Sequence, residues 1–165
     1  MVFEYYCDGA ASMHLVDGEY KRGNGGWAFA LIKDGSAAVV ERSGSKTPTT
    51  NQEMELMAID KCLTFHYFET DDVSGTEEVV KIYTDSAYCF NIFTNWVYSW
   101  RKNNWTRKGN KPIENLELIK DIYQVFEDLN YVGVKVEFIK VSGHSGNKWN
   151  EYVDKLAVKA KENCK

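Results

Sequence analysis

The chain has 165 residues and a net charge of −4, and hydrophobic residues make up 44% of it. This size suits one domain with a real core, and the negative charge argues weakly against a protein held to nucleic acid by its overall charge. No apolar run is long enough to cross a membrane, and the start "MVFEYYCDG" lacks the features of a signal peptide. We therefore expect a soluble cytoplasmic protein with a single domain over residues 1–165.

The predicted elements alternate between strand and helix patterns along the chain. Apolar alternation and β-branched residues indicate strands, while apolar residues at helical spacing indicate helices. A polar loop is expected over residues 9–26, and the Asp34-Gly35 turn joins two strands in a hairpin. In chain order the elements are strands at 2–8, 27–33 and 37–44, a helix at 51–69, a strand at 79–84, short helices at 86–102, a helix at 114–130, a strand at 134–141 and a helix at 147–163.

This order, βββαβ followed by a helical block and βα, favours an α/β fold with a five-stranded mixed sheet and helices on both faces. Thr49 or Thr50 can cap the helix at 51–69. The four cysteines form no C-x-x-C motif and the three histidines no H-x-x-x-H pair, so a soft-metal site is not expected. Reduced thiols are the default without a secretion signal. Hard-metal sites built from carboxylates remain open.

Acidic residues stand at the ends of two predicted strands. Asp8 ends the first strand and Asp85 ends "VVKIYTD". Taken alone, Asp85 reads as a turn or helix cap, because Asp and Ser favour both. If the two strands are neighbours, however, their carboxylates are adjacent. Two carboxylates about 4 Å apart repel by roughly 4 kcal/mol at an effective dielectric near 20, and divalent cations would offset that cost.

Five blocks of the chain, in order and in one register, resemble type 1 ribonucleases H. They are "YYCDGAAS", "TTNQEMELMA", "IYTDSAY", "NWVYSWRKNNWTRKGNKPIENLEL" and "VSGHSGNKWNEYVDKLA". The resemblance covers nearly the whole chain. It implies the ribonuclease H-like fold and an endonuclease that hydrolyses the RNA strand of RNA–DNA hybrids. The products would carry 5′-phosphate and 3′-hydroxyl ends.

The resemblance also implies the catalytic residues. It gives two Mg²⁺ ions as cofactors, with Mn²⁺ expected to substitute, and a histidine on a mobile loop that assists proton transfer or product release. Glu53, two residues before a ligand position, is interpreted instead as a solvated glutamate in the first turn of a helix. The implied metal ligands are Asp8, Glu55, Asp85 and Asp154, and the histidine is His144.

The segment 95–115 carries basic residues with no acid among them between Arg101 and Lys111. One interpretation is that the basic residues are exposed to solvent and the tryptophans pack in the core. Cations beside aromatic rings, however, also suit a nucleic-acid groove. The resemblance identifies this segment as the family's basic protrusion. The expected nucleic-acid-binding residues are Thr50, Asn51, Gln52, Tyr88, Trp96, Trp100, Arg101, Lys102, Trp105, Arg107, Lys108, Lys111 and Asn115.

The resemblance is incomplete at one binding position, and two other functions stay open. Pro48 stands where several family members place an arginine of the phosphate pocket, so either Lys46 compensates or the grip is weaker. A DNA nuclease of the same fold and a non-catalytic binding module are the alternatives. The "TNQ" block and the basic protrusion argue against the first, and the full set of carboxylates argues against the second. We expect a monomer with no obligate protein partner and no membrane association.

Overall fold

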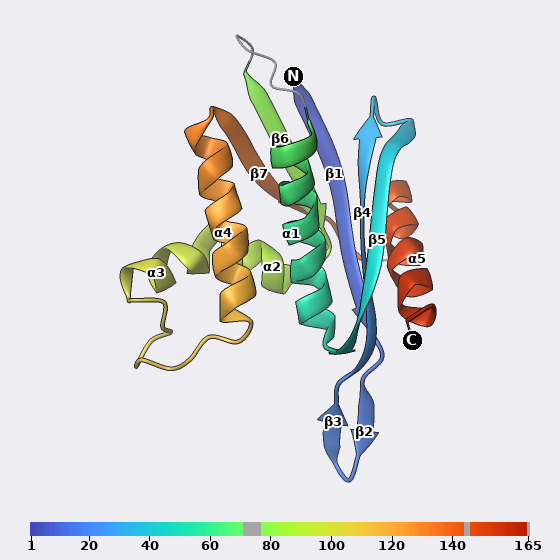
Figure 1. Cartoon of the computed structure of the whole chain (residues 1–165), viewed down its shortest axis with the longest axis vertical. Coiled ribbons are helices and arrows are strands. Elements are labelled where there is room, and N and C mark those ends of the chain that lie inside the picture. The colour runs from blue at the N-terminus through green and yellow to red at the C-terminus, as the bar shows by residue number, and fades with distance from the viewer. Residues whose placement is uncertain (71–76, 144–145, 165) are drawn as a thin grey trace.

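The computed structural model describes residues 1–70, 77–143 and 146–164 (Figure 1). A mixed five-stranded sheet, in the order β5-β4-β1-β6-β7, forms the centre of the fold, and a separate two-stranded ribbon is made by β2 and β3. The elements are β1 Val2–Ala11, β2 His14–Val16, β3 Glu19–Lys21, β4 Gly23–Lys33, β5 Ala37–Thr49, α1 Asn51–Glu69, β6 Glu78–Thr84, α2 Ala87–Asn91, the π-helix η1 Ile92–Trp96, α3 Val97–Lys102, α4 Leu116–Tyr131, β7 Val134–Lys140 and α5 Lys148–Glu162.

The sheet combines an antiparallel half with a parallel half. β1, β4 and β5 are antiparallel neighbours, whereas β1, β6 and β7 run parallel. Asp34 and Gly35 both have positive φ, as a tight hairpin turn between β4 and β5 requires. Because β1 and β6 are parallel neighbours, their carboxyl ends lie at the same edge of the sheet.

Helices cover both faces of the sheet, as the sequence predicted (Figure 1). α1 packs on β1 and β4 with α4 beside it over β7, and α5 packs on the opposite face against β4, β1 and β5. The main core lies under α1 and α4 and includes Tyr5, Phe29, Leu56 and Ile122. None of the described helices is long and apolar enough to cross a lipid bilayer.

One glycine allows α1 to lie very close to β1. A Cβ atom at Gly9 would lie 2.3 Å from the carbonyl carbon of Met54, which no other residue type could accommodate without a shift of the backbone. Thr50 caps the helix, since its side chain accepts a hydrogen bond from the Glu53 N–H. The glycine and the cap together place the first turns of α1 against the carboxyl end of β1.

The prediction of a polar loop over residues 9–26 is wrong. β1 continues to Ala11, and residues 14–21 form the β2–β3 hairpin, which projects beyond the sheet where β1 ends and α1 begins (Figure 1). Asp17 and Gly18 have φ of 52° and 80°, which fits the two-residue turn favoured in hairpins. Strands of three residues are too short to produce a recognisable alternation. β5 is also longer than predicted and runs to Thr49, directly before α1.

Candidate active site

Two of the predicted carboxylates meet at the ends of β1 and β6. Cys7 pairs with Thr84 at the last position of the parallel ladder, so Asp8 and Asp85 follow on adjacent strands. Asp8 is buried, with 5% of its surface exposed, and one of its oxygens accepts a hydrogen bond from the Gly9 N–H at 2.9 Å. The sheet topology therefore brings together two acidic groups that are 77 positions apart, at 8 and 85.

The other two carboxylates reach this place from helices on opposite faces of the sheet. Asp154 of α5 is hydrogen-bonded to the side chain of Asp8. Glu55, in the first turns of α1, accepts a hydrogen bond from the Ser86 hydroxyl at 2.8 Å, directly beside Asp85. The structure thus brings all four predicted ligands to the carboxyl end of the two parallel strands.

Electrostatics at this place are unfavourable for the charged forms of the acids. Burial raises the pKa of Asp8 to about 9, and the nearby Asp85 and Asp154 add to the rise. Burial raises the pKa of Glu55 to about 7 against the lowering effect of the Ser86 hydrogen bond, and Asp85 adds a smaller rise. Uncharged groups donate to the cluster: the Gly9 N–H to Asp8, the Ser86 hydroxyl to Glu55 and the Asn150 amide to Asp85.

The chemistry of the side chains fits a hard divalent cation. Carboxylate oxygens are the ligands that Mg²⁺ prefers. The Oδ1 atom of Asn150, on α5, is buried and has no hydrogen-bond partner among the described residues, and its Nδ2 donates to Asp85 at 3.4 Å. Within the described ranges, however, no group of three or more His, Cys, Asp or Glu side chains is close enough to hold an ion as it stands. The residue types support metal binding, while the spacing requires side-chain adjustment.

Glu53 is directed away from this cluster, but it is not solvated as predicted. Lys46 forms an ion pair with it at 2.7 Å, and the Thr49 hydroxyl donates to its other oxygen at 2.5 Å. Burial alone would raise the pKa of Glu53, yet these contacts outweigh burial and lower it. Lys46 is therefore engaged with Glu53 rather than free to replace the arginine that Pro48 excludes.

A groove of about 680 Å³ opens beside the carboxylates and contains the first group of predicted substrate-binding residues. It runs between the start of α1, the start of α2 and the segment before α4. The Asn115 amide donates to the Tyr88 hydroxyl at 3.3 Å, which fixes one wall. The predicted residues on its lining are Thr50, Asn51, Gln52, Glu55, Asp85, Tyr88 and Asn115.

A second groove, of about 490 Å³, shares Gln52 and Tyr88 with the first and extends toward the basic segment. Trp96 and Trp100 line it with their ring centroids 5.9 Å apart, and Arg107 stands at its margin. This combination of neighbouring indole rings and a guanidinium group suits a nucleic-acid strand.

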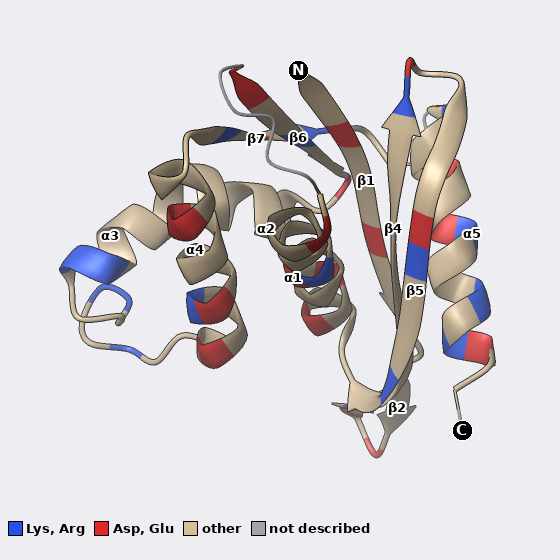
Figure 2. Cartoon of the chain, turned by 45° about the horizontal axis from the view of Figure 1, so that its top comes forward, with Lys and Arg blue, Asp and Glu red and all other residues tan. Residues whose placement is uncertain are grey.

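The remaining basic-segment residues are divided between packing and exposure. Arg101 donates to the Tyr123 hydroxyl at 3.3 Å, and the Trp105 ring lies edge-on to Tyr123 at 5.7 Å, so both lie against α4. Figure 2 shows the positive charge gathered on α3 and the loop after it. Exposed side chains there, with no groove around them, are Lys102, Lys108 and Lys111. His144 lies outside the described residues.

Sequence reasoning missed several side chains of the site. Ser86 supports Glu55 and also caps α2, a role that its position after Asp85 could have indicated. Asn150 lies four residues before Asp154, the spacing that puts two side chains on one helix face. Met13 and Arg22 also line the carboxylate groove. No sequence pattern indicated a role for Met13 or Arg22, because residues 9–26 are predicted to form a loop.

The fold and the site define an α/β protein with an acidic cluster at the carboxyl ends of two parallel strands and a groove lined with polar and aromatic residues. Residues 2–162 match the family model described as RNase H. The chain belongs to the ribonuclease H family and is an enzyme of that family, whose members cleave RNA in RNA–DNA hybrids.

The relatives are similar over almost the full chain. Ribonuclease H of Treponema denticola is 34% identical over 167 residues, covering 97% of both chains. Ribonuclease H of Thermoanaerobacter sp. strain X514 is 33% identical and covers 95% of this chain and 88% of the relative. Among solved structures, LC9-RNase H1, a type 1 RNase H with the type 2 active-site motif, superimposes with a TM-score of 0.74 at 31% identity, over 98% of this chain and 72% of that one. The predicted resemblance to type 1 enzymes is confirmed.

Proposed function

We propose that the chain, as one catalytic domain over residues 1–165, is an endonuclease that hydrolyses the RNA strand of RNA–DNA hybrids with two Mg²⁺ ions. The observation that carries this proposal is the convergence of Asp8, Glu55, Asp85 and Asp154 on one place where their burial and mutual repulsion disfavour their charges. A solely structural role would not maintain such a cluster, since it costs stability.

Each carboxylate has a part in this proposal. Asp8, the most buried of the four, would hold the ions together with Glu55, Asp85 and Asp154. The bound ions would activate a water molecule and stabilise the charge of the leaving 3′-oxygen. Mn²⁺, which also takes oxygen ligands, would substitute. The products would be a 5′-phosphate and a 3′-hydroxyl.

The protein's own groups would orient the ligands and the substrate. Ser86 holds Glu55 by a hydrogen bond, and Asn150 holds Asp85, so two ligands have fixed partners before metal binds. Asn51 and Gln52 face the groove at the start of α1 and would contact the RNA strand and its 2′-hydroxyls. His144 is proposed to carry a proton or to assist product release, as its counterparts in the family do.

The remaining substrate contacts would lie on the DNA strand. Tyr88, Trp96 and Trp100 line the adjoining groove and would pack against deoxyribose and bases, which leaves no room for a 2′-hydroxyl. Thr50 and Asn115 would grip a phosphate of the same strand. In the basic segment, the groups proposed to add phosphate contacts are Arg101, Lys102, Trp105, Arg107, Lys108 and Lys111.

One assay tests the function directly. A labelled RNA–DNA hybrid, a duplex DNA and a duplex RNA of the same sequence are each incubated with the protein, with and without Mg²⁺. We expect cleavage of the RNA strand of the hybrid alone, only with the metal, and products that a 5′-phosphate-dependent exonuclease degrades. Cleavage of the duplex DNA would support a DNA nuclease of the same fold, and no cleavage at all would support a binding module.

A further inference from the structure

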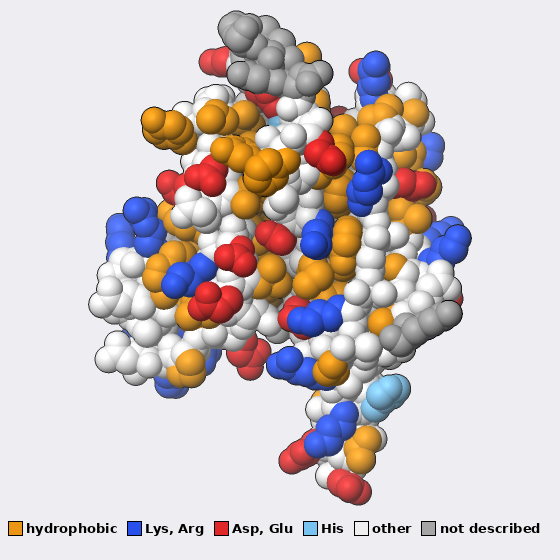
Figure 3. Space-filling model, viewed as in Figure 1, with side chains coloured by type: hydrophobic (Ala, Val, Ile, Leu, Met, Phe, Trp, Pro, Cys, Tyr) orange, Lys and Arg blue, Asp and Glu red, His pale blue; other side chains and the backbone are white. Residues whose placement is uncertain are grey.

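The β2–β3 hairpin, residues 13–22, stands clear of the body and contributes nothing to the core. All six of its strand residues are exposed, including Leu15 at 63% and Tyr20 at 71%. Figure 3 shows the hairpin projecting from the body of the molecule. An isolated hairpin is at best marginally stable, and exposed apolar side chains on it favour a surface that another molecule covers.

The base of this hairpin is held firmly beside the active site. The Ser12 N–H donates to the Asn24 carbonyl at 2.8 Å, which closes the ribbon at its base. The Ala11 N–H donates to the side chain of Asn51, the first residue of α1, at 2.6 Å. Asn51 itself lines the carboxylate groove, so the direction of the hairpin is fixed relative to that groove.

The two faces of the hairpin differ in character. Leu15 lies opposite Tyr20 in the ladder, and alternation along each strand puts Met13 on the side of Leu15 and Arg22 on the side of Tyr20. This face, called here the apolar-cationic face, consists of Met13, Leu15, Tyr20 and Arg22. The opposite face carries His14 paired with Lys21 and Val16 paired with Glu19.

Charge separates these faces further. Lys21 is neutralised by an ion pair with Glu19 at 3.2 Å on the opposite face, whereas Arg22 is the one charged group of the apolar-cationic face. Met13 and Arg22 line the same groove as Glu55 and Asp85, and Arg22 also borders a smaller groove toward α5. The apolar-cationic face is therefore a continuation of the groove beyond the carboxylates.

We propose that the apolar-cationic face is an additional contact surface for the RNA–DNA hybrid, which lengthens its footprint past the carboxylate groove. Arg22 would contact a backbone phosphate, and Tyr20 with Leu15 would pack against sugars and bases in the adjacent minor groove. The β2–β3 hairpin is roughly 13–17 Å long from Arg22 to the Asp17-Gly18 turn, which corresponds to about four base-pair steps. This inference rests on the proposed function, since it names a further part of the same substrate site.

Binding is measured in the Asp8→Asn background, which leaves the hybrid uncut, by fluorescence anisotropy over a series of salt concentrations. Arg22→Ala should lower the slope of log affinity against log salt by about 0.7–0.9, as one lost phosphate contact does. Its control, Lys21→Ala, removes the same charge from the neighbouring residue on the opposite face and should leave the slope unchanged.

Tyr20→Ser should weaken binding by about tenfold, within the range for loss of one aromatic contact, and Tyr20→Phe should retain the affinity. When the hybrid is shortened by about four base pairs from one end, Tyr20→Ser and its parent should bind it with equal affinity. Shortening from the other end should leave the difference in affinity unchanged. The control here is Val16→Ser on the opposite face.

Equal effects of Arg22→Ala and Lys21→Ala, together with a change of less than twofold for Tyr20→Ser, would overturn the inference. All three substitutions are at exposed positions, and thermal unfolding of each variant verifies that the fold is retained. The proposed function fails in a different way, by the absence of hybrid cleavage by the wild-type protein with Mg²⁺. An active wild type with unaffected hairpin variants would reject the hairpin surface alone.

Discussion

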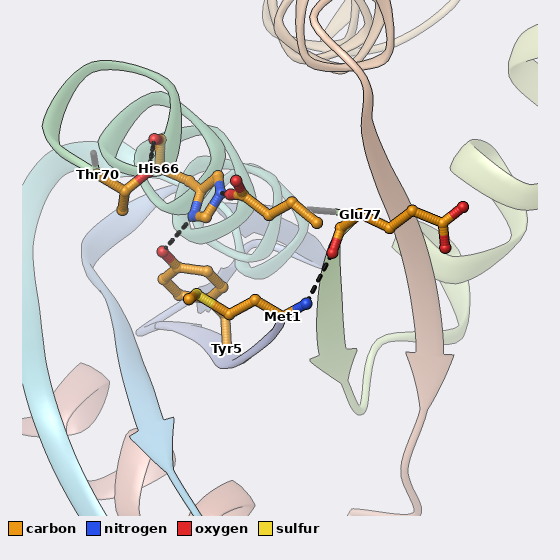
Figure 4. Close-up of polar contacts among 6 residues, drawn as sticks. Met1, Tyr5, His66, Thr70 and Glu77 are labelled. Atoms are coloured by element: carbon orange, nitrogen blue, oxygen red, sulfur yellow. Dashed lines mark hydrogen bonds and ion pairs between the residues drawn. The ribbon is translucent and has the colours of Figure 1, made fainter. Parts of the chain in front are cut away.

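Helix α1 carries a titratable side chain near each end, and the surroundings of the two are opposite. Near its start, Glu55 lies beside Asp85, a group of the same sign. Near its end, buried His66 lies between complementary partners. The Tyr5 hydroxyl is 2.7 Å from one ring nitrogen (Figure 4), and the Glu78 carboxylate contacts the other. If the Glu78 carboxylate accepts from Nε2–H, then Nδ1 accepts from the Tyr5 hydroxyl, and every polar group has a partner.

The contrast separates a part of the fold that serves stability from one that serves binding. The His66 cluster ties α1 to β1 and β6 by hydrogen bonds that stabilise the native state. The acidic cluster at the other end of the same helix opposes folding, because burial and mutual repulsion disfavour its charged forms. The following substitutions and measurements test this difference, beginning with the largest expected effect.

Asp8→Asn should abolish hybrid cleavage. The loss should exceed the roughly 10²–10⁴-fold expected for removal of a single general acid–base group, because the substitution removes a carboxylate of the proposed metal site. Single-turnover cleavage of a labelled hybrid measures it. The control is Asp121→Asn, the same change at an exposed position of α4, which should keep full activity. Near-normal turnover of Asp8→Asn would refute the assignment of the metal site.

Replacing Lys102, Arg107 and Lys108 together by alanine should raise KM strongly and leave kcat nearly unchanged, because these groups bind ground state and transition state alike. The salt slope of binding should fall by up to about 2–3 units if all three contact phosphates. Steady-state kinetics at several salt concentrations provide both values. The exposed lysines Lys33, Lys135 and Lys159 serve as a matched triple control. A basic segment without substrate contacts would leave KM and slope as in the control.

Tyr5→Phe should lower the free energy of unfolding by about 1–3 kcal/mol, because the substitution leaves a buried ring nitrogen of His66 without its donor. Cleavage activity should remain unchanged, since this cluster is at the other end of α1. Urea unfolding monitored by tryptophan fluorescence measures the effect. Tyr131→Phe is the control, as Tyr131 is 92% exposed and its hydroxyl should contribute almost nothing. Equal stability of both variants would contradict a structural role.

The His66 cluster and the acidic cluster should also change the stability of the protein with pH in opposite directions. Burial lowers the pKa of His66, despite the opposing effect of Glu78. The stability that His66 contributes is therefore present above the pKa of the unfolded state, about 6.5, and is lost as the pH falls through the lower pKa of the folded state. The pKa of Asp8 is raised in the folded state. The stability that Asp8 contributes is therefore present below about pH 4 and is lost as the pH rises toward about 9. Unfolding measured between pH 5 and 9 tests both. His66→Gln should reduce the loss of stability at low pH, and Asp8→Asn should reduce the loss of stability at high pH. Unchanged pH profiles would count against both assignments.

Local sequence patterns placed Asp8 and Asp85 after apolar strand segments and indicated the cap at Thr50, although β1 continues past Asp8 to Ala11. Glu55 and Asp154 came from the family resemblance, because local patterns do not show how the helices pack beside these strands. The hairpin at 14–21 was missed because its strands have three residues each, too few for a period to be visible. The contacts of Arg101 and Trp105 with Tyr123 were not predictable either, because they depend on how α4 packs beside α3 in the folded chain.

The central claim, that the acidic cluster opposes folding until cations occupy it, is tested most directly by thermal unfolding of the wild type and Asp8→Asn over a Mg²⁺ titration at constant ionic strength. Without Mg²⁺ the variant should have the higher Tm, because asparagine removes the cost of burying an acid beside Asp85 and Asp154. With increasing Mg²⁺ the wild type should gain stability as ligand binding to the native state requires, while the variant changes little. A wild type that is no less stable than the variant without Mg²⁺, and that does not respond to the ion, would contradict the claim.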